Sequence, residues 1–255
     1  MKRVTALVGS ARKKNTYHAV VQFLNDLQAL GDVEYEIVTL SDYTLKACRG
    51  CELCLWKGEE FCPLKDDRDK LLDKIMASDG VIFATPNYNG QVSGIMKTFL
   101  DRFAFVCHRP RYFGKVSTSI VTYSFAGNDK IVEYLDTLAM TLGFNVVKGA
   151  CINAVEPRTE RDQRKMDWAR ARQAQQFYRG LAEPAYPAPT LLMLAIFRTF
   201  RSTIRQASDD SSRDYRYYAE KGWFESDYYY PARLGLLKKA AGRVFDSMAV
   251  RKALA

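Results

Sequence analysis

The chain has 255 residues, of which 47% are hydrophobic and 26% charged, a composition typical of a globular protein and not of a disordered one. Its formal net charge is +9, but the cations form no dense stripe and no recognisable module, so we expect no nucleic-acid partner. No signal peptide follows Met1, and the longest apolar run, 191–197, is far shorter than the roughly 20 residues of a membrane span. We therefore expect a cytoplasmic protein without a membrane span.

The first predicted elements are a strand at 3–8, a loop of small and polar residues at 9–16, and a helix at about 15–30. Backbone N–H groups of such a loop and the helix N-terminus converge on one point and favour an anion. Ser10, Arg12, Asn15 and Thr16 add donors suited to phosphate. The loop lacks both G-x-G-x-x-G and the Walker motif, which argues against a dinucleotide fold and a nucleotide triphosphatase. A polar turn before a capped helix is the alternative.

A cysteine-rich loop at 48–62 follows the second predicted strand, 34–38. Cys48, Cys51, Cys54 and Cys62 have the spacing C-x2-C-x2-C-x7-C and precede Pro63. Two successive C-x2-C steps and a C-P pair are similar to ferredoxin spacing, in which thiolates hold a [4Fe–4S] cluster. Structural zinc and metal-free thiols are the two alternatives.

Three further strands are predicted at 80–84, 116–123 and 144–151, and the intervening helices at about 66–78, 93–106, 128–142 and 158–181. Strands that alternate with helices form a parallel sheet covered on both faces. Five strands with an anion loop after the first favour a doubly wound, flavodoxin-like α/β sheet with the order 2-1-3-4-5. We assign residues 1–183 to this domain.

The loops after the third and fourth strands are expected beside the first loop, because ligands of such sheets bind at the carboxyl ends of the strands. In the third-strand loop, Pro86 fixes the backbone, Asn87 and Asn89 supply turn chemistry, and Tyr88 offers a flat aromatic face beside the loop's backbone amides. The fourth-strand loop offers Ser124 and Gly127. Together they favour a flat heteroaromatic ligand, although ordinary strand-to-helix turns would look similar.

The composition changes in the tail, 184–255, where prolines are followed by twelve Lys/Arg against seven Asp/Glu. We expect helices at about 190–206 and 232–253 around an aromatic patch at 215–230. This helical extension needs apolar surface to cover, either in its own core or on a neighbouring subunit. Binding at a membrane surface is an alternative for the first of these helices, and a docked helix explains the same pattern.

Taken together, these residues resemble the flavodoxin-like NAD(P)H-dependent FMN reductases, and among them the iron–sulfur flavoproteins. The resemblance covers about the first 150 residues and lies in the following stretches: 9–16, the cysteine run, Asp66-Asp67, Thr85 to Tyr88, Met96-Lys97 and Asp101-Arg102. It implies that Ser10, Arg12, Asn15 and Thr16 hold the FMN phosphate. It also implies that Pro86, Asn87, Tyr88 and Asn89 flank the isoalloxazine, that Ser124 and Gly127 close its far side, and that Cys48, Cys51, Cys54 and Cys62 hold the cluster.

The function that the resemblance implies is an FMN-dependent NAD(P)H oxidoreductase that passes electrons to a small-molecule or protein acceptor. No side chain needs to act as an acid or base, so we name binding residues and no catalytic ones. Two alternatives remain: a quinone or azo-compound reductase with structural cysteines, and an FMN-containing electron carrier without its own NAD(P)H site. A homodimer or homotetramer is expected.

Overall fold

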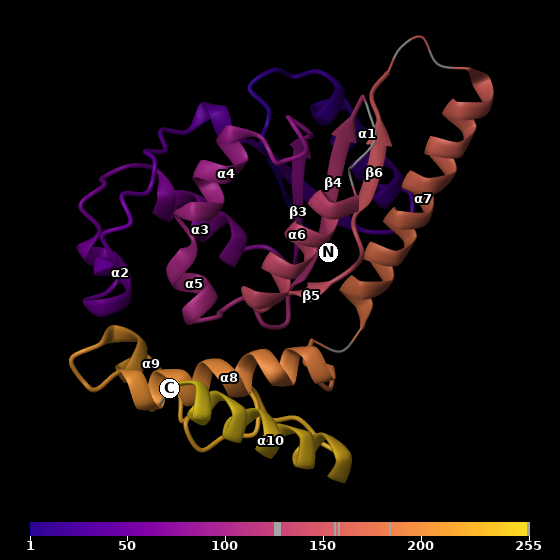
Figure 1. The fold of residues 1–255 in the computed structure, drawn as a ribbon. Helices are drawn as coiled ribbons and strands as arrows, with labels where there is room; N and C mark the ends of the chain where they lie inside the picture. Colours follow the sequence, from indigo (N-terminus) through magenta and orange to yellow (C-terminus); the bar gives the residue numbers. More distant parts are fainter. Residues whose placement is uncertain (125–128, 156, 158, 184, 254–255) are drawn as a thin grey trace. The chain divides into compact units, whose positions relative to one another are not determined.

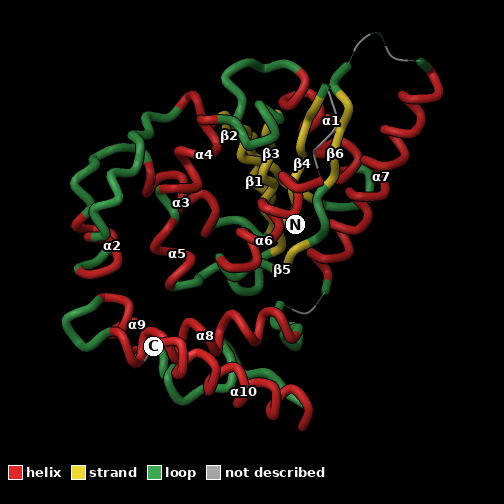
Figure 2. Tube along the Cα trace, in the orientation of Figure 1, coloured by secondary structure: helices red, strands yellow, loops and turns green. Residues whose placement is uncertain are grey.

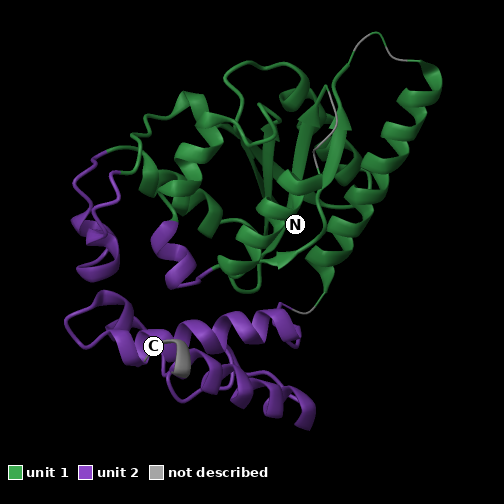
Figure 3. Ribbon diagram, in the orientation of Figure 1, with its two compact units in different colours: residues 1–48, 66–103, 112–183 green, residues 49–65, 104–111, 184–255 purple. Residues whose placement is uncertain are grey.

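The computed structural model describes residues 1–124, 129–155, 157, 159–183 and 185–253 (Figure 1). The chain forms two compact units (Figure 3). The first contains Met1–Cys48, Asp66–Phe103 and Tyr112–Glu183. The second contains Arg49–Lys65, Ala104–Arg111 and Pro184–Ala255, so it combines the tail with two segments from earlier in the chain.

The first unit is built on a parallel sheet (Figure 2). Its strands are β1 (Lys2–Val8), β2 (Val33–Thr39), β3 (Gly80–Pro86), β4 (Val116–Tyr123), β5 (Asn145–Val146) and β6 (Ala150–Asn153). The strand order is β2-β1-β3-β4-β5, and β6 also pairs with β4. The predicted order 2-1-3-4-5 is therefore confirmed, and the strands end side by side at one edge.

Helices cover both faces of this sheet (Figure 1). They are α1 (Asn15–Gln28), α3 (Arg68–Met76), α4 (Gly94–Asp101), α6 (Asp129–Thr141) and α7 (Glu160–Ala182), with a short 3₁₀ turn at Leu40–Asp42. On one face, Val4 and Ala6 of β1 pack in a core cluster with Phe23 of α1 and Phe177 of α7. Side chains alternate along a strand, so Leu7 points to the opposite face, where it is also fully buried.

The fifth predicted strand, 144–151, is divided into β5 and β6. Ser117 of β4 lies opposite Val146 and Ile120 opposite Ala150, so three steps along β4 match four along its partner. The extra residue is a bulge held by Asp136 of α6, whose carboxylate accepts hydrogen bonds from the Gly149 N–H at 3.0 Å and the Ser119 hydroxyl at 2.9 Å. A side chain at 149 would collide with Ser119, because its Cβ would lie 1.9 Å from Oγ.

The helix predicted at 93–106 is also divided. It forms α4 and a separate short helix, α5 (Ala104–His108). Between them lies Arg102, whose side chain is 2% exposed and donates two hydrogen bonds to the carboxylate of Asp66, at 2.7 and 3.1 Å. The guanidinium also donates to the Lys46 carbonyl oxygen at 3.1 Å.

The second unit is helical and has an aromatic core. It contains α2 (Leu53–Trp56), a 3₁₀ turn at Glu59–Phe61, α5, α8 (Leu191–Ala207), α9 (Arg213–Glu220) and α10 (Leu236–Ala253). The expected aromatic patch includes α9, and Tyr218, Trp223 and Tyr228 are buried within it. Within the described residues, none of the helices is both long and apolar enough to cross a membrane.

Candidate functional site

The loop between β1 and α1 is held close to the start of α4. Gly9 donates its N–H to the Ala84 carbonyl oxygen of β3 at 2.8 Å, and its own carbonyl oxygen accepts from the Ser93 hydroxyl. A Cβ at position 9 would lie only 2.7 Å from the Met96 Cβ. Glycine is therefore needed for this close approach, which directs the rest of the loop towards the carboxyl edge of the sheet.

The N-terminus of α1 is suited to an anion. Lys14 occupies the N-cap position but makes no side-chain capping hydrogen bond, and the first turn contains no acidic residue. The first N–H groups of a helix have no partner within the helix, and the helix dipole places partial positive charge there. Arg12 and Lys14 add exposed cations, and the Ser10 hydroxyl donates to the Arg12 carbonyl oxygen at 2.8 Å. An anionic group is the complementary ligand.

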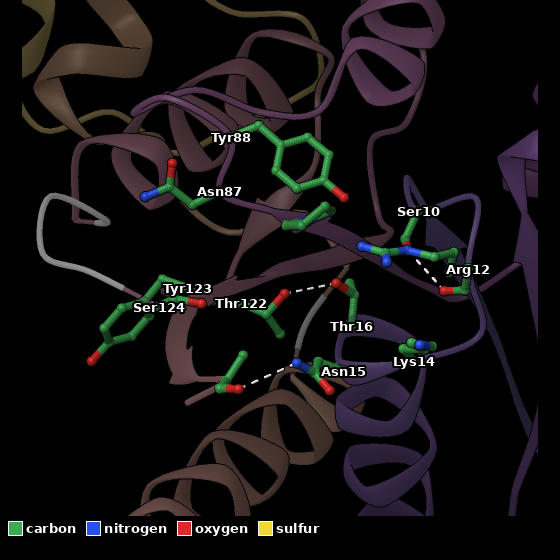
Figure 4. A pocket seen from close by; sticks show the side chains of 12 residues that line it. Ser10, Arg12, Lys14, Asn15, Thr16, Asn87, Tyr88, Thr122, Tyr123 and Ser124 are labelled. Carbon is green, nitrogen blue, oxygen red and sulfur yellow. Dashed lines mark hydrogen bonds between the residues drawn. The ribbon is translucent and has the colours of Figure 1, made fainter. Parts of the chain in front are cut away.

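This helix end opens into a pocket of about 260 Å³ (Figure 4). Three loops and the segment after β6 line it, with Ser10, Arg12, Lys14, Asn15, Thr16, Pro86, Asn87, Tyr88, Thr122, Tyr123, Ser124 and Ala154. Two hydrogen bonds join its sides: Thr16 Oγ1 to Thr122 Oγ1 at 2.6 Å, and Asn15 Nδ2 to the Ala154 carbonyl oxygen at 3.2 Å. Since the hydroxyl of the buried Thr16 is already paired with Thr122, this side chain ties α1 to β4.

The loop after β3 forms the second wall and contains a tight, hydrogen-bonded turn. Tyr88 and Gln91 exchange two backbone hydrogen bonds, at 3.0 and 3.1 Å, across Asn89 and Gly90. These two central residues have φ of +51° and +75°, as in a type I′ turn. The Asn87 N–H donates to the Thr122 carbonyl oxygen at 2.7 Å, which joins this loop to the end of β4. The ring of Tyr88 is 51% exposed, so it offers a face to a flat ligand.

The structure brings eight of the predicted FMN-binding residues into this pocket: Ser10, Arg12, Asn15, Thr16, Pro86, Asn87, Tyr88 and Ser124. Asn89 is not among the described residues that line it and serves instead at the tip of the turn. Gly127 lies outside the described residues. Sequence reasoning missed Lys14, Thr122, Tyr123 and Ala154. Of these, Thr122 and Tyr123 could have been found, since they end a strand beside two predicted site loops.

The cysteine loop does not form a metal centre as folded. Cys48 and Cys51 are exposed, whereas Cys54 and Cys62 are half-buried, and all are thiols. Four thiolates are the donor set of iron–sulfur clusters and of structural zinc. Across the part of the chain that the structure describes, however, no three or more His, Cys, Asp or Glu side chains are gathered so that they could hold a metal ion. Four cysteine thiols are suitable donors for a metal, but their side chains are not gathered in a way that could hold one.

Comparison with known proteins places the chain in a family. The family model for NADPH-dependent FMN reductases matches residues 2–156. Two iron–sulfur flavoproteins of Archaeoglobus fulgidus are 40% and 34% identical over 39% and 58% of this chain. The chain spans 48% and 70% of their respective lengths.

A solved structure of RosB with a bound riboflavin-phosphate intermediate is similar with a TM-score of 0.53 and 14% identity, and the match covers 92% of each chain. At that identity the likeness shows a shared fold. The family match itself includes all three strands whose ends form the pocket, together with the loops after β1 and β3. The chain belongs to the NADPH-dependent FMN reductase family.

Proposed function

We propose that the protein is an FMN-dependent NAD(P)H oxidoreductase and that the pocket of Figure 4 holds FMN. The observation that carries the proposal is the α1 N-terminus, which has no side-chain cap and opens into a pocket walled by an exposed aromatic ring. The helix end and Arg12 hold the phosphate, together with Ser10 when its hydroxyl turns from the Arg12 carbonyl oxygen. Tyr88 and the backbone of the β3 loop orient the flavin ring. When bound, FMN supplies hydride acceptance at N5 and onward electron transfer.

The residues of this chain bind and orient FMN and do not transfer protons. Arg12 carries a permanent charge, and a guanidinium can donate two parallel hydrogen bonds to phosphate oxygens. The turn at Asn89-Gly90 fixes the β3 loop, so little conformational entropy is lost when a ligand binds. The half-exposed Tyr88 leaves one side of the pocket accessible to a nicotinamide donor.

A comparison of two flavins tests the phosphate site. Replacing Arg12 by Ala should weaken FMN binding about 10- to 100-fold, because a hydrogen bond to a charged group contributes about 1.5–3 kcal/mol. Riboflavin lacks the phosphate, so its binding should be nearly unchanged. Lys13→Ala is the matched control, since the Lys13 ammonium lies 5.7 Å from the centre of the Tyr17 ring and does not line the pocket. Equal losses for FMN and riboflavin would show that Arg12 does not hold a phosphate.

A [4Fe–4S] cluster on Cys48, Cys51, Cys54 and Cys62 is a second proposal, supported by the cysteine spacing and by the relatives' name, iron–sulfur flavoprotein. Because these side chains are not gathered as folded, the loop would have to rearrange to hold it. Iron and acid-labile sulfide in anaerobically purified protein, lost in Cys48→Ser with Cys51→Ser, support the cluster. Zinc in their place, or no metal, contradicts it.

The electron acceptor is a small molecule or a redox protein in this proposal, and the assembly is a homodimer or homotetramer in the cytoplasm. An electron carrier without its own NAD(P)H site is the competing function. Steady-state oxidation of NADPH with a quinone supports the reductase. A protein that binds FMN but oxidises neither NADPH nor NADH with any acceptor supports the carrier.

A further inference from the structure

Two helices of the second unit, α8 and α10, run side by side in the same direction. Lys238 near the start of α10 donates to the Pro189 carbonyl oxygen just before α8 at 2.6 Å. Further along, Asp246 of α10 accepts hydrogen bonds from Arg198 at 2.9 Å and Arg201 at 2.6 Å of α8. Gly242 lies against the Arg198 guanidinium, and Ala249 is buried. One face of α10 is therefore packed against α8.

The other face of α10 is apolar and exposed. Leu236 is 86% exposed and Leu237 88%, and Val244 and Met248 are 55% and 63% exposed. Positions 236, 240, 244 and 248 recur at helical spacing and share this face. Leu191 and Leu192 at the start of α8 are also exposed. We call these six apolar residues, namely Leu191, Leu192, Leu236, Leu237, Val244 and Met248, the exposed α8–α10 face. Large exposed apolar patches on soluble proteins mark interaction surfaces.

Cations border this face and are not neutralised within it. Lys239 and Arg243 are exposed and follow Leu236 on the helix surface by three and seven positions. The sequences of α8 and α10 contain one acidic residue, Asp246. Its carboxylate is already shared by Arg198 and Arg201. Neither helix therefore has an acidic side chain left for Lys239 and Arg243.

The positive charge of Lys239 and Arg243 distinguishes between the partners that could cover the exposed α8–α10 face. A second copy that packed this face against itself would bring two sets of Lys239 and Arg243 into one interface with no free acidic residue from α8 or α10, which disfavours self-association through this face. Exposed leucines beside Lys and Arg, with no acidic residue between them, are complementary to the surface of a membrane with anionic lipids. There, each cation near the surface gains from the negative potential, and the leucines leave water.

We propose that the exposed α8–α10 face binds the surface of a membrane that contains anionic lipids. α10 lies in the headgroup region along its exposed stripe, and Leu191 and Leu192 extend the contact. The binding is peripheral and does not involve the FMN pocket. It therefore holds whether or not the flavin assignment does.

Vesicle cosedimentation of the full-length protein tests the proposal. The protein should sediment with vesicles of phosphatidylcholine and phosphatidylglycerol, and much less with phosphatidylcholine alone. Lys239→Gln with Arg243→Gln should weaken binding about fivefold for each charge removed. Leu236→Ser with Leu237→Ser should weaken it about tenfold or more, because each leucine contributes through its buried area. All four side chains project from the surface or border it, so the variants should keep the wild-type circular dichroism spectrum.

A matched control separates a specific surface from a general charge effect. Arg161 and Lys165 are exposed on α7 with the same four-residue spacing as Lys239 and Arg243. Arg161→Gln with Lys165→Gln removes the same net charge and should leave vesicle binding unchanged. An equal loss in this control, or no loss in the leucine variant, would overturn the proposal. So would a dimer in light scattering that becomes a monomer in the leucine variant, because a second copy would then cover the face.

Discussion

Gly9 is the residue on which the geometry of the pocket depends most directly. Replacing Gly9 by Ala places a Cβ 2.7 Å from the Met96 Cβ, and such overpacking costs about 1–3 kcal/mol. We expect a lower midpoint in urea unfolding and weaker FMN binding, because the loop must move away from α4. Gly94→Ala is the control, since a Cβ at this first residue of α4 meets nothing within 4 Å. Equal stability of the two variants would contradict the assigned close approach.

Cys151 should react more slowly than the exposed Cys48 and Cys51. Burial, with Asp129 nearby, raises the pKa of its thiol to about 11. The thiolate is the reactive form, so at pH 8 alkylation by iodoacetamide should be about two orders of magnitude slower than for a thiol of ordinary pKa. Peptide mass spectrometry after timed alkylation measures this against the exposed Cys48 and Cys51. The rate for Cys151 should rise as the pH approaches 11; a rate at pH 8 similar to that of Cys48 would contradict the assigned environment.

Much of the pocket could be predicted residue by residue from the sequence, because the order of strands in the sheet determines which loops meet. Parallel strands end at the same edge of a sheet, so loops far apart in sequence can be placed together without coordinates. Ala154 could not be found in this way, because it follows β6, and the division between β5 and β6 depends on Asp136 of α6. Asn89 has a turn-forming conformation, which its Asn-Gly sequence could have indicated.

At the scale of elements, α5, α9 and the turn after α2 are joined by a buried ionic cluster. Arg109 is fully buried and donates to Asp214, to Glu59 at 2.8 Å and to the Cys54 carbonyl oxygen at 2.8 Å. Arg111 also donates to Glu59, at 2.9 Å. Burial acts to raise the pKa of Glu59, but a backbone hydrogen bond and the charges of the two arginines outweigh burial and lower the pKa below its usual value. The cluster therefore ties the segment that contains Cys54 to helices from two other parts of the chain.

Removing one carboxylate from this cluster should be costly. Asp214→Ala leaves the Arg109 guanidinium buried and only partly compensated, so we expect a loss of about 3 kcal/mol in the free energy of unfolding. Glu225→Ala is the control, because the Arg205–Glu225 pair is 52% and 79% exposed and such pairs contribute less than about 1 kcal/mol. Urea unfolding measures both. Similar effects of the two substitutions would mean that the cluster does not stabilise the second unit.

The types of most elements were predicted correctly, and the two errors in their extent have long-range causes. The division between α4 and α5 falls at Arg102, whose buried partner Asp66 lies 36 residues earlier. Hydrophobic periodicity within 93–106 cannot show such a partner. The division of the fifth strand likewise depends on a carboxylate from another helix. Local pattern predicts the kind of element, and tertiary contacts decide where it ends.

At the scale of the whole molecule, composition indicated the helical tail but not the two earlier segments that fold with it. The second unit also contains Arg49–Lys65 and Ala104–Arg111, which come from the region of the predicted α/β domain. The buried ion pair of Arg109 and Asp214 joins the segment 104–111 to the tail. Such an ion pair leaves no periodic signal in the sequence. The sequence indicated the tail as an apolar surface in need of cover, with membrane-surface binding as an alternative for the helix at about 190–206 and not for α10.

The most direct test of the central claim is the reduction of bound FMN by NADPH under anaerobic conditions. The protein is loaded with FMN, freed of unbound flavin, mixed with NADPH and followed by the absorbance of oxidised flavin. The account predicts that the oxidised band is lost with NADPH or NADH and returns when a quinone is added. A protein that retains no FMN, or a bound flavin that stays oxidised with both nicotinamides, would contradict the account.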